Sequence, residues 1–519
     1  MSNWSGISAL FGSEEGIGAT IKAKIKSTVA AVRSSPRGVG VVFVALVLLV
    51  AVISTQWIDG ELFLSDSAID VSTRDQSQSQ SHIKHSPPRP PPTPINFTCP
   101  SNTSIKPTCS KRITPTSPPS PSSSSCPEYF RYIYEDLRPW NATGITEAMV
   151  ESARRFATFR LVVVDGRAYV EKYTGAFQTR DVFSLWGIAQ LLNRYPGRVP
   201  DVDLMFSCGD FPIVYPRDYQ DSPPPPIFHY NKDHVTLDIL FPDWSFWGWV
   251  EVNIRSWENV TEEIKKGSER VNWKDREPYA YWKGNPKVAR IREELLKCNA
   301  TNTSDWNARL YDQNWLHAVI SGFKGTNLAD QCVHRYKIYV EGCSWSVSQK
   351  YILACDSPVL LITTPFLEFW SRGLMPGQHY WPIPRQDMCD PIKFAVDWGN
   401  SHPKEAQEIG RKGSSFIQEE VSMDYVYQYM LQLLTEYAKL LRYKPVIPKN
   451  ATELCSESMA CQAGRNEKAF MLDSMVRFVA DSEPCTMPPP FDRKELEQIA
   501  REKDKFVKQV EMWEHGQRD

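Results

Sequence analysis

Hydrophobic and polar positions divide the chain into three regions. Residues 38–55 form an uncharged run dominated by Val, Leu and Ala. Residues 58–125 are rich in Pro, Ser and Thr and poor in large apolar side chains. From residue 126 onward, short apolar runs alternate with amphipathic stretches. That alternation predicts a folded body of strands and helices.

Within the body, apolar runs that end at turn residues predict strands at 160–164, 168–172, 203–208, 279–282, 336–340, 359–363 and 379–383. Helical spacing of apolar residues predicts helices at 182–195, 290–298, 346–355, 391–398, 405–421, 424–443 and 492–513. The last of these is highly charged, which is typical of a peripheral helix. The pair Asp165-Gly166 predicts a hairpin between the first two strands. Strands that alternate with helices indicate an α/β body with mostly parallel sheets.

The apolar run is long enough to span a membrane. As a helix, its 18 residues would extend roughly 27 Å. A cleaved signal peptide would start nearer the N-terminus, and a buried core helix would have a polar face. We therefore predict a cytosolic tail at 1–37 and one transmembrane helix at 38–57.

The charges on either side of this span orient it. Basic residues precede the span (Lys22, Lys24, Lys26, Arg33, Arg37), and acidic residues follow it (Asp59, Glu61, Asp66, Asp70). The positive-inside rule then places everything beyond about residue 57 in a lumen. The short span suits a Golgi or endoplasmic reticulum membrane, and the chain ends without a retention signal of the Lys-Asp-Glu-Leu type, so we expect this anchor to retain it.

Sequons and cysteines support a lumenal body. Beyond the span, Asn-x-Ser/Thr sequons begin at Asn96, Asn102, Asn141, Asn259, Asn299, Asn302 and Asn450. Another, at Asn3, falls on the cytosolic side. All 12 cysteines follow the span, beginning with Cys99, as expected for disulfides in an oxidising compartment. Their spacing does not fix the pairing, and Cys455 and Cys461 lack the companions of a zinc site.

The composition of the chain bears on its partners, on the stem and on possible sugar binding. Lys and Arg total 59 against 61 Asp and Glu, a net charge of -2, which gives no electrostatic case for nucleic acid as a partner. The prolines at 58–125 favour an extended stem that holds the body away from the membrane. Seventeen Trp and 21 Tyr can stack on sugar rings, although most such rings belong to cores.

Asp210 is the first candidate for chemistry. It follows a predicted buried strand and is flanked by Gly209 and Pro212. Ligands of open α/β sheets bind outside the carboxyl ends of strands, where a carboxylate can act as general base. The alternative is a structural Asp that caps the following turn.

A second candidate is the segment 336–350, in which a strand leads through a Gly- and Ser-containing turn into a helix. Backbone N–H groups in such a turn can hold a diphosphate, with Ser344 and Ser346 as further donors or simply as helix caps. The segment is not a Walker sequence. Arg292, with Arg290 nearby, can pair with phosphate oxygens or can belong to an ordinary surface helix face.

Two further patterns have two interpretations each. Asp201-Val202-Asp203 matches an Asp-x-Asp metal pattern, but it opens a strand without other ligands nearby, so we interpret it as a strand-start turn and predict no essential metal. The aromatic cluster containing Trp244, Phe246 and Trp247 forms either a wall of an acceptor groove or a core between lobes.

Taken in order, several segments resemble glycosyltransferase family ninety, which groups the Rumi-type protein O-glucosyltransferases with the fungal capsule-associated xylosyltransferases. The resemblance extends over roughly 127–443. Its carriers are the segments 200–204, 209–212, 238–247, 280–284, 336–342, 346–357 and 379–380. The versions at 283–286 and 345–348 resemble the membrane-anchored land-plant branch.

The resemblance implies a GT-B fold of two Rossmann-like lobes with a cleft, here an N-terminal acceptor lobe at 126–275 and a C-terminal nucleotide-sugar lobe at 276–445, followed by an extension at 446–519. It implies a UDP-sugar donor, inversion at the anomeric carbon and no metal. Asp210 falls on the family's general base. Donor-binding positions fall on Arg292 or Arg290, Gly284, Gly342, Ser344, Ser346, Ser348 and Lys350. Rumi enzymes have an arginine at the position of Ser348, so the phosphate contacts and the choice of sugar are open.

We therefore expect an inverting, metal-independent glycosyltransferase that moves glucose or xylose from a UDP-sugar to a hydroxyl group of a protein or polysaccharide. A catalytically silent lumenal protein that binds glycan or nucleotide is the alternative. A glycoside hydrolase would need a second carboxylate facing Asp210, and none is evident in the sequence.

Overall fold

The computed structural model describes residues 92–100, 107–110, 113–114, 118–121 and 124–516. The predicted transmembrane helix at 38–57 lies outside these residues. Among the helices that the structure describes, none combines the length and apolarity needed to cross a membrane.

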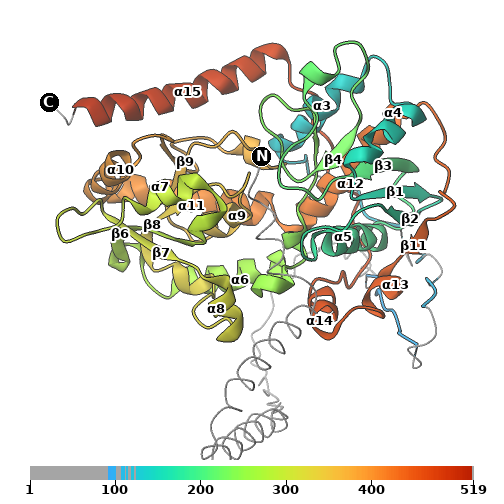
Figure 1. Ribbon diagram of the computed structural model, residues 1–519, viewed down its shortest axis with the longest axis horizontal. Helices are drawn as coiled ribbons and strands as arrows, with labels where there is room; N and C mark the ends of the chain where they lie inside the picture. The colour runs from blue at the N-terminus through green and yellow to red at the C-terminus, as the bar shows by residue number, and fades with distance from the viewer. Residues whose placement is uncertain (1–91, 101–106, 111–112, 115–117, 122–123, 517–519) are drawn as a thin grey trace, which may run out of the picture. The chain divides into compact units, whose positions relative to one another are not determined.

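The body is α/β and contains two sheets (Figure 1). The first sheet has the order β11-β2-β1-β3-β4-β5, and the second has the order β10-β9-β8-β6-β7. The strands are β1 Phe159–Val164, β2 Arg167–Lys172, β3 Val202–Phe206, β4 Ile227–His229, β5 Ile239–Leu240, β6 Glu277–Gly284, β7 Ala308–Asp312, β8 His334–Tyr339, β9 Val359–Ile362, β10 Trp381–Ile383 and β11 Thr452–Leu454.

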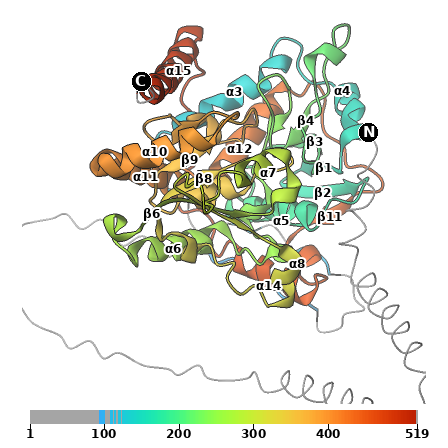
Figure 2. The same ribbon diagram turned by 60° about the vertical axis from the view of Figure 1, so that its left-hand side comes forward.

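The helices that follow or surround these strands are α3 Tyr132–Leu137, α4 Glu147–Ser152, α5 Arg180–Arg194, α6 Trp257–Glu269, α7 Arg290–Leu296, α8 Trp315–Ile320, α9 Ser348–Leu353, α10 Cys389–Ser401, α11 Pro403–Ser415, α12 Met423–Leu440, α13 Ser456–Ala460, α14 Arg465–Asp473 and α15 Arg493–Gly516. The seven predicted helices overlap α5, α7, α9, α10, α11, α12 and α15, and the other helices named here were not predicted. In Figure 2, α10 and α11 lie side by side next to the second sheet, and α10 contacts β6 and β10.

The expectation of mostly parallel sheets is correct for the second sheet and wrong for part of the first. All neighbours in the second sheet are parallel. In the first, β3, β4 and β5 are parallel, but β1 is antiparallel to both β2 and β3, and β11 is antiparallel to β2. The reason is the hairpin at Asp165 and Gly166, both with positive φ, because this turn reverses the chain directly into the adjacent strand.

Two segments pack differently from the predicted division of the chain. The helix α12, expected within the lobe at 276–445, contacts α3, α5 and β3 of the first sheet's layer. The strand β11, from the extension at 446–519, forms the edge of the first sheet. The buried apolar residues form one cluster around the first sheet and another around the second.

The prediction of an extended stem through residue 125 is wrong for its described part. Ile95 is buried against the body. Disulfides join Cys99 to Cys461 and Cys109 to Cys455, and Cys126 pairs with Cys485. These covalent links supply the stability that the polar, Pro-rich sequence cannot derive from burial. The remaining disulfides are Cys298–Cys389 and Cys332–Cys355, and Cys208 and Cys343 are free.

Candidate active site

Asp210 lies four residues beyond the end of β3, on a turn at the edge of the first sheet. Its side chain is 37% exposed and forms an ion pair with Arg180, whose Nη1 is 2.8 Å from Oδ1. Arg180 is the first residue of α5, and its guanidinium lies over the Trp244 ring at 4.6 Å. The carboxylate is therefore open to solvent on one side and fixed by a buried cation on the other, an arrangement suited to a group that accepts a proton from a bound molecule.

The backbone of Asp210 is held from two directions. Asn231 Nδ2, from the segment after β4, donates to the carbonyl oxygen of Asp210 at 2.7 Å. The hydroxyl of Ser344 donates to the same oxygen from the loop that follows β8. The second bond brings a predicted donor-binding residue of the second sheet into contact with the predicted base of the first.

Arg292 organises the loop that contains Ser344. Its Nε donates to the Glu341 carbonyl oxygen at 2.7 Å, Nη1 to the Asn285 carbonyl oxygen at 3.1 Å, and Nη2 to Ser346 Oγ at 3.1 Å. Burial lowers the pKa of Arg292 to about 10, so the guanidinium stays charged at neutral pH. The carboxylate of Glu341 is turned away, toward Arg385 and Thr364.

These hydrogen bonds leave the charge of Arg292 uncompensated, because each of its hydrogen-bond acceptors within the described part of the chain is a neutral oxygen. A buried cation with neutral partners creates a positive potential over the adjacent loop. Arg290, by contrast, points outward with a side chain that is 90% exposed and lies 3.8 Å from Glu294. The structure thus separates the two alternatives, with Arg292 next to the candidate loop and Arg290 on the helix surface.

Two glycines allow the close packing of this loop. A Cβ atom on Gly342 would lie 2.9 Å from the Trp345 carbonyl oxygen, and one on Gly284 would lie 2.6 Å from the Trp282 ring. Ser346 Oγ and Ser348 Oγ are 2.9 Å apart, with Ser348 opening α9. The backbone N–H of Ser346 already donates to the Tyr339 hydroxyl, so the half-buried hydroxyls of Ser346 and Ser348 are the loop's more available donors.

Lys350 is buried and not open to a ligand, contrary to its predicted role in donor binding; its ammonium donates to the Val347 carbonyl oxygen of this loop at 3.3 Å. It is fully buried, with Nζ at 2.7 Å from Ser245 Oγ and 3.3 Å from Asp243 Oδ2. Burial alone would lower the pKa of Lys350, but Asp243 raises it and keeps the ammonium charged. The ammonium is thus part of a buried ion pair that joins α9 to the aromatic segment.

Of the two interpretations of the aromatic cluster, the structure supports the core and not the wall of an acceptor groove. Trp244, Phe246 and Trp247 are each at most 1% exposed. Trp244 packs edge-on against Tyr230 and Trp345, and Trp247 donates to the Tyr427 hydroxyl at 2.9 Å. Rings packed on every side cannot stack on a ligand.

The Asp-x-Asp pair has structural partners, in agreement with its interpretation as a strand-start turn. Asp201 accepts a hydrogen bond from the Asp165 N–H at 2.9 Å, at the hairpin. Asp203 is fully buried in β3 and pairs with both ends of the Arg160 guanidinium, at 2.7 and 2.6 Å. Tyr443 adds a third hydrogen bond to its carboxylate at 2.8 Å.

Arg180 and Asn231 belong to the site but were not predicted from sequence. Arg180 precedes Asp210 by 30 residues and Asn231 follows it by 21. Neither has a local pattern that distinguishes it from a surface residue. The available signal was topological, because the segment after β4 must lie beside the end of β3 in a parallel pair.

Comparisons with known proteins identify relatives of this chain. The family model described as Glycosyl transferase family 90 matches residues 121–514. Protein O-glucosyltransferase 1 of Bos taurus is 27% identical over 330 residues, which cover 61% of this chain and 81% of that protein. O-glucosyltransferase rumi of Drosophila melanogaster is 24% identical over 339 residues, covering 62% and 78% respectively. Sucrose-phosphate synthase of Thermosynechococcus elongatus aligns at 12% identity over 36% of this chain and 44% of that one, with a TM-score of 0.21, an overlap too small to describe the fold.

Proposed function

The chain belongs to glycosyl transferase family 90, and from this premise we propose that it transfers glucose or xylose from a UDP-sugar to an acceptor hydroxyl with inversion at the anomeric carbon. It is a glycosyltransferase by its family and its relatives. The relatives are named protein O-glucosyltransferases, which favours a polypeptide over a polysaccharide as the acceptor. The observation that carries the mechanism is the half-exposed Asp210 carboxylate, held by Arg180 beside the loop of Ser344.

In the proposed reaction, Asp210 removes the proton from the acceptor hydroxyl as its oxygen attacks the anomeric carbon. The bond from that carbon to the diphosphate breaks at the same time, and UDP departs with the bonding electrons. Attack from the face opposite the leaving group inverts the configuration. The ion pair with Arg180 fixes the position of the carboxylate.

The loop at 342–348 is the proposed binding site for the diphosphate. The uncompensated charge of Arg292 attracts the developing negative charge, and the hydroxyls of Ser346 and Ser348 can donate to phosphate oxygens. This arrangement supplies electrostatic stabilisation from the protein alone, and we propose that no metal is required. Ser348 stands where Rumi enzymes have an arginine, so Arg292 carries more of the charge here.

The architecture and location complete the proposal. We assign the two sheets to the two lobes of a GT-B fold, with the cleft between the turn of Asp210 and the loop of Ser344. The segment 38–57 anchors the chain, by this proposal, in a Golgi or endoplasmic reticulum membrane with the body in the lumen. Sequons after the span and the five disulfides support an oxidising compartment. The assignment to a land-plant branch stays a prediction.

The test is release of UDP by the full-length chain in detergent, supplied with UDP-glucose or UDP-xylose and a panel of acceptors, with and without EDTA. Asp210→Asn should lower kcat by about 10²- to 10⁴-fold, while UDP binding stays as in the wild type and the melting temperature falls by no more than a few degrees, because the half-buried ion pair with Arg180 is weakened. Wild-type turnover by that variant would dismiss Asp210 as the base. Nucleotide binding without turnover across the panel would favour the catalytically silent alternative, and loss of activity in EDTA would refute the metal-free mechanism.

A further inference from the structure

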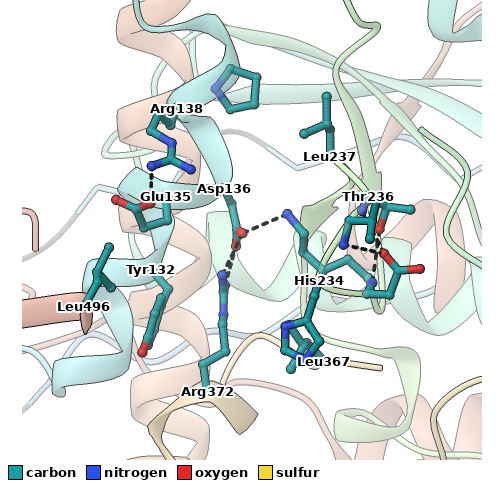
Figure 3. A pocket seen from close by; sticks show the side chains of 14 residues that line it. Tyr132, Glu135, Asp136, Arg138, His234, Thr236, Leu237, Leu367, Arg372 and Leu496 are labelled. Atoms are coloured by element: carbon teal, nitrogen blue, oxygen red, sulfur yellow. Dashed lines mark hydrogen bonds and ion pairs between the residues drawn. The ribbon is translucent and has the colours of Figure 1, made fainter. Parts of the chain in front are cut away.

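A pocket of about 390 Å³ lies next to the candidate site and has no role in the mechanism above (Figure 3). Its walls come from α3, from the segment 232–237 after β4, and from Leu367, Arg372 and Leu496. Four parts of the chain that are distant in sequence therefore meet in it, including the helix α15.

The inner end of the pocket carries an excess of positive charge. Asp136 is 1% exposed, and both nitrogens at the end of Arg372 contact its carboxylate, one of them at 2.8 Å (Figure 3). Lys232 Nζ approaches the same carboxylate at 3.2 Å. Behind them, Lys503 Nζ donates to the Arg372 carbonyl oxygen at 2.7 Å. Two cations thus contact one carboxylate, and a third binds the backbone of Arg372.

The other charged groups of the pocket offset only part of this excess, because Asp233 adds one negative charge to the lining. On the rim, Glu135 pairs with Arg138 at 3.1 Å, so these two charges cancel. Asp233 directs Oδ1 to the backbone N–H groups of Val235 and Thr236, at 2.8 and 2.7 Å. Its carboxylate therefore serves the turn and not the inner end.

Hydrogen-bond donors are also in excess. The Lys232 ammonium has three N–H groups, and its one hydrogen-bond partner among the described residues is Asp136. Its remaining donors are free to bind a group that only accepts. A carboxylate is such a group, and hydrogen bonds between ionised partners are among the strongest that proteins form.

The pocket adjoins the candidate base. Asn231 binds the Asp210 backbone, and the next residue, Lys232, reaches into the pocket. Lys232 also exchanges two backbone hydrogen bonds with Leu367, at 3.1 and 2.7 Å. On the outer side, the rings of Phe211 and Phe366 are 6.3 Å apart, and they join the turn of Asp210 to the wall at Leu367.

Two large apolar side chains are exposed along this path. Phe211 is 57% exposed and Val235 is 61% exposed. Apolar residues that remain open beside a reactive group are typical of a surface that a partner covers. A polypeptide can cover both of them while one of its side chains enters the pocket.

We propose that this pocket is a specificity subsite for the polypeptide acceptor and takes an acidic side chain located near the hydroxyl that receives the sugar. This inference rests on the function proposed above. The acceptor chain covers Phe211 and Val235, its carboxylate pairs with Lys232, and its hydroxyl lies at Asp210. The leucines at 237, 367 and 496 accommodate the methylene groups of a Glu side chain.

Binding, measured without transfer, tests this inference separately from the enzymatic activity. Fluorescent peptides with one central Ser and a single Glu at each of several spacings are titrated into the full-length chain in the presence of UDP, beside twins with Gln in place of Glu. We expect the best Glu peptide to bind about tenfold more tightly than its twin. Lys232→Gln, which can still donate to Asp136, should abolish the preference. Arg138→Gln is the matched control and should retain it, because its charge is already paired.

Direct UDP binding shows that each variant is folded, and it also separates a failed subsite from a failed enzyme. If Lys232→Gln does not fold, His234→Glu places a negative charge in the same pocket and should remove the preference instead. Equal affinity for Glu and Gln peptides, or an unchanged preference in the folded Lys232→Gln protein, overturns the inference. Displacement of the peptides by free glucuronate but not by glucose would also overturn it, since the occupant would then be an acidic sugar.

Discussion

Replacing Asp203 by Asn is expected to lower the free energy of unfolding by about 3 kcal/mol. The carboxylate is fully buried and pairs with both ends of the Arg160 guanidinium, whose side chain is 10% exposed. At about 4 Å between charge centres and an effective dielectric constant of about 20, the attraction is about 4 kcal/mol. Glu151 lies 3.4 Å from Arg160 and still pairs with it after the substitution. The expected loss of stability is therefore about 3 kcal/mol and not the full ~4 kcal/mol.

The melting temperature measures this change. If roughly 390 residues unfold together, 3 kcal/mol corresponds to a decrease of about 4 °C. Glu453→Gln is the control on the same sheet, because its partner Arg167 is 42% exposed and such surface pairs contribute less than about 1 kcal/mol. A decrease for Asp203→Asn no larger than that of the control would refute the reasoning. A stable variant whose turnover now depends differently on added Mn²⁺ would instead identify Asp203 as a metal ligand.

Three further predictions address the site and the second sheet. Ser344→Ala should lower kcat several-fold with the KM for the donor unchanged, because the substitution removes a hydrogen bond to the backbone of Asp210. Ser344→Thr should restore most of the rate. A change in KM alone would contradict this prediction. Gly342→Ala should weaken UDP binding, because the added Cβ would lie 2.9 Å from the Trp345 carbonyl oxygen. Titration calorimetry measures this affinity, and a wild-type value would show that the loop is not the diphosphate site. Burial lowers the pKa of Lys337 to about 7. Between pH 7 and 10.5 the folded state therefore binds fewer protons than the unfolded state. The free energy of unfolding of the wild type should increase as pH rises through that range. Thermal unfolding of Lys337→Met should lack this gain, and parallel pH curves for both proteins would exclude Lys337 as its source.

The sequence predicted features that depend on neighbouring residues. The hairpin at Asp165-Gly166, the strand before Asp210 and the exposed position of Asp210 all follow from local turn chemistry and strand periodicity. Lys350 was misassigned because its partner, Asp243, is 107 residues away and no local pattern shows that the ammonium is buried. The role of the aromatic cluster, as groove wall or core, was left open because a high density of aromatic residues does not show whether their rings are buried or face a ligand.

Long-range links also limited the prediction of the stem. The composition of this region favours an extended segment, whereas Ile95 is buried against the body. Its attachment depends on Cys455 and Cys461, which lie 346 and 362 residues from their partners. Cysteine spacing does not determine such pairings, so the docking of this segment could not be read from the sequence.

Those same links constrain how the protein can be made. Cys99, Cys109 and Cys126 emerge early from the ribosome, whereas Cys455, Cys461 and Cys485 emerge more than 340 residues later. At roughly 5–20 residues per second, the early thiols wait about 20–70 s for their partners. Throughout that interval they are exposed to exchange with other nascent thiols, Cys208 and Cys343 among them. In the lumen proposed above, we therefore expect correct pairing to depend on an isomerase that holds or reshuffles these three amino-terminal cysteines until translation is nearly complete.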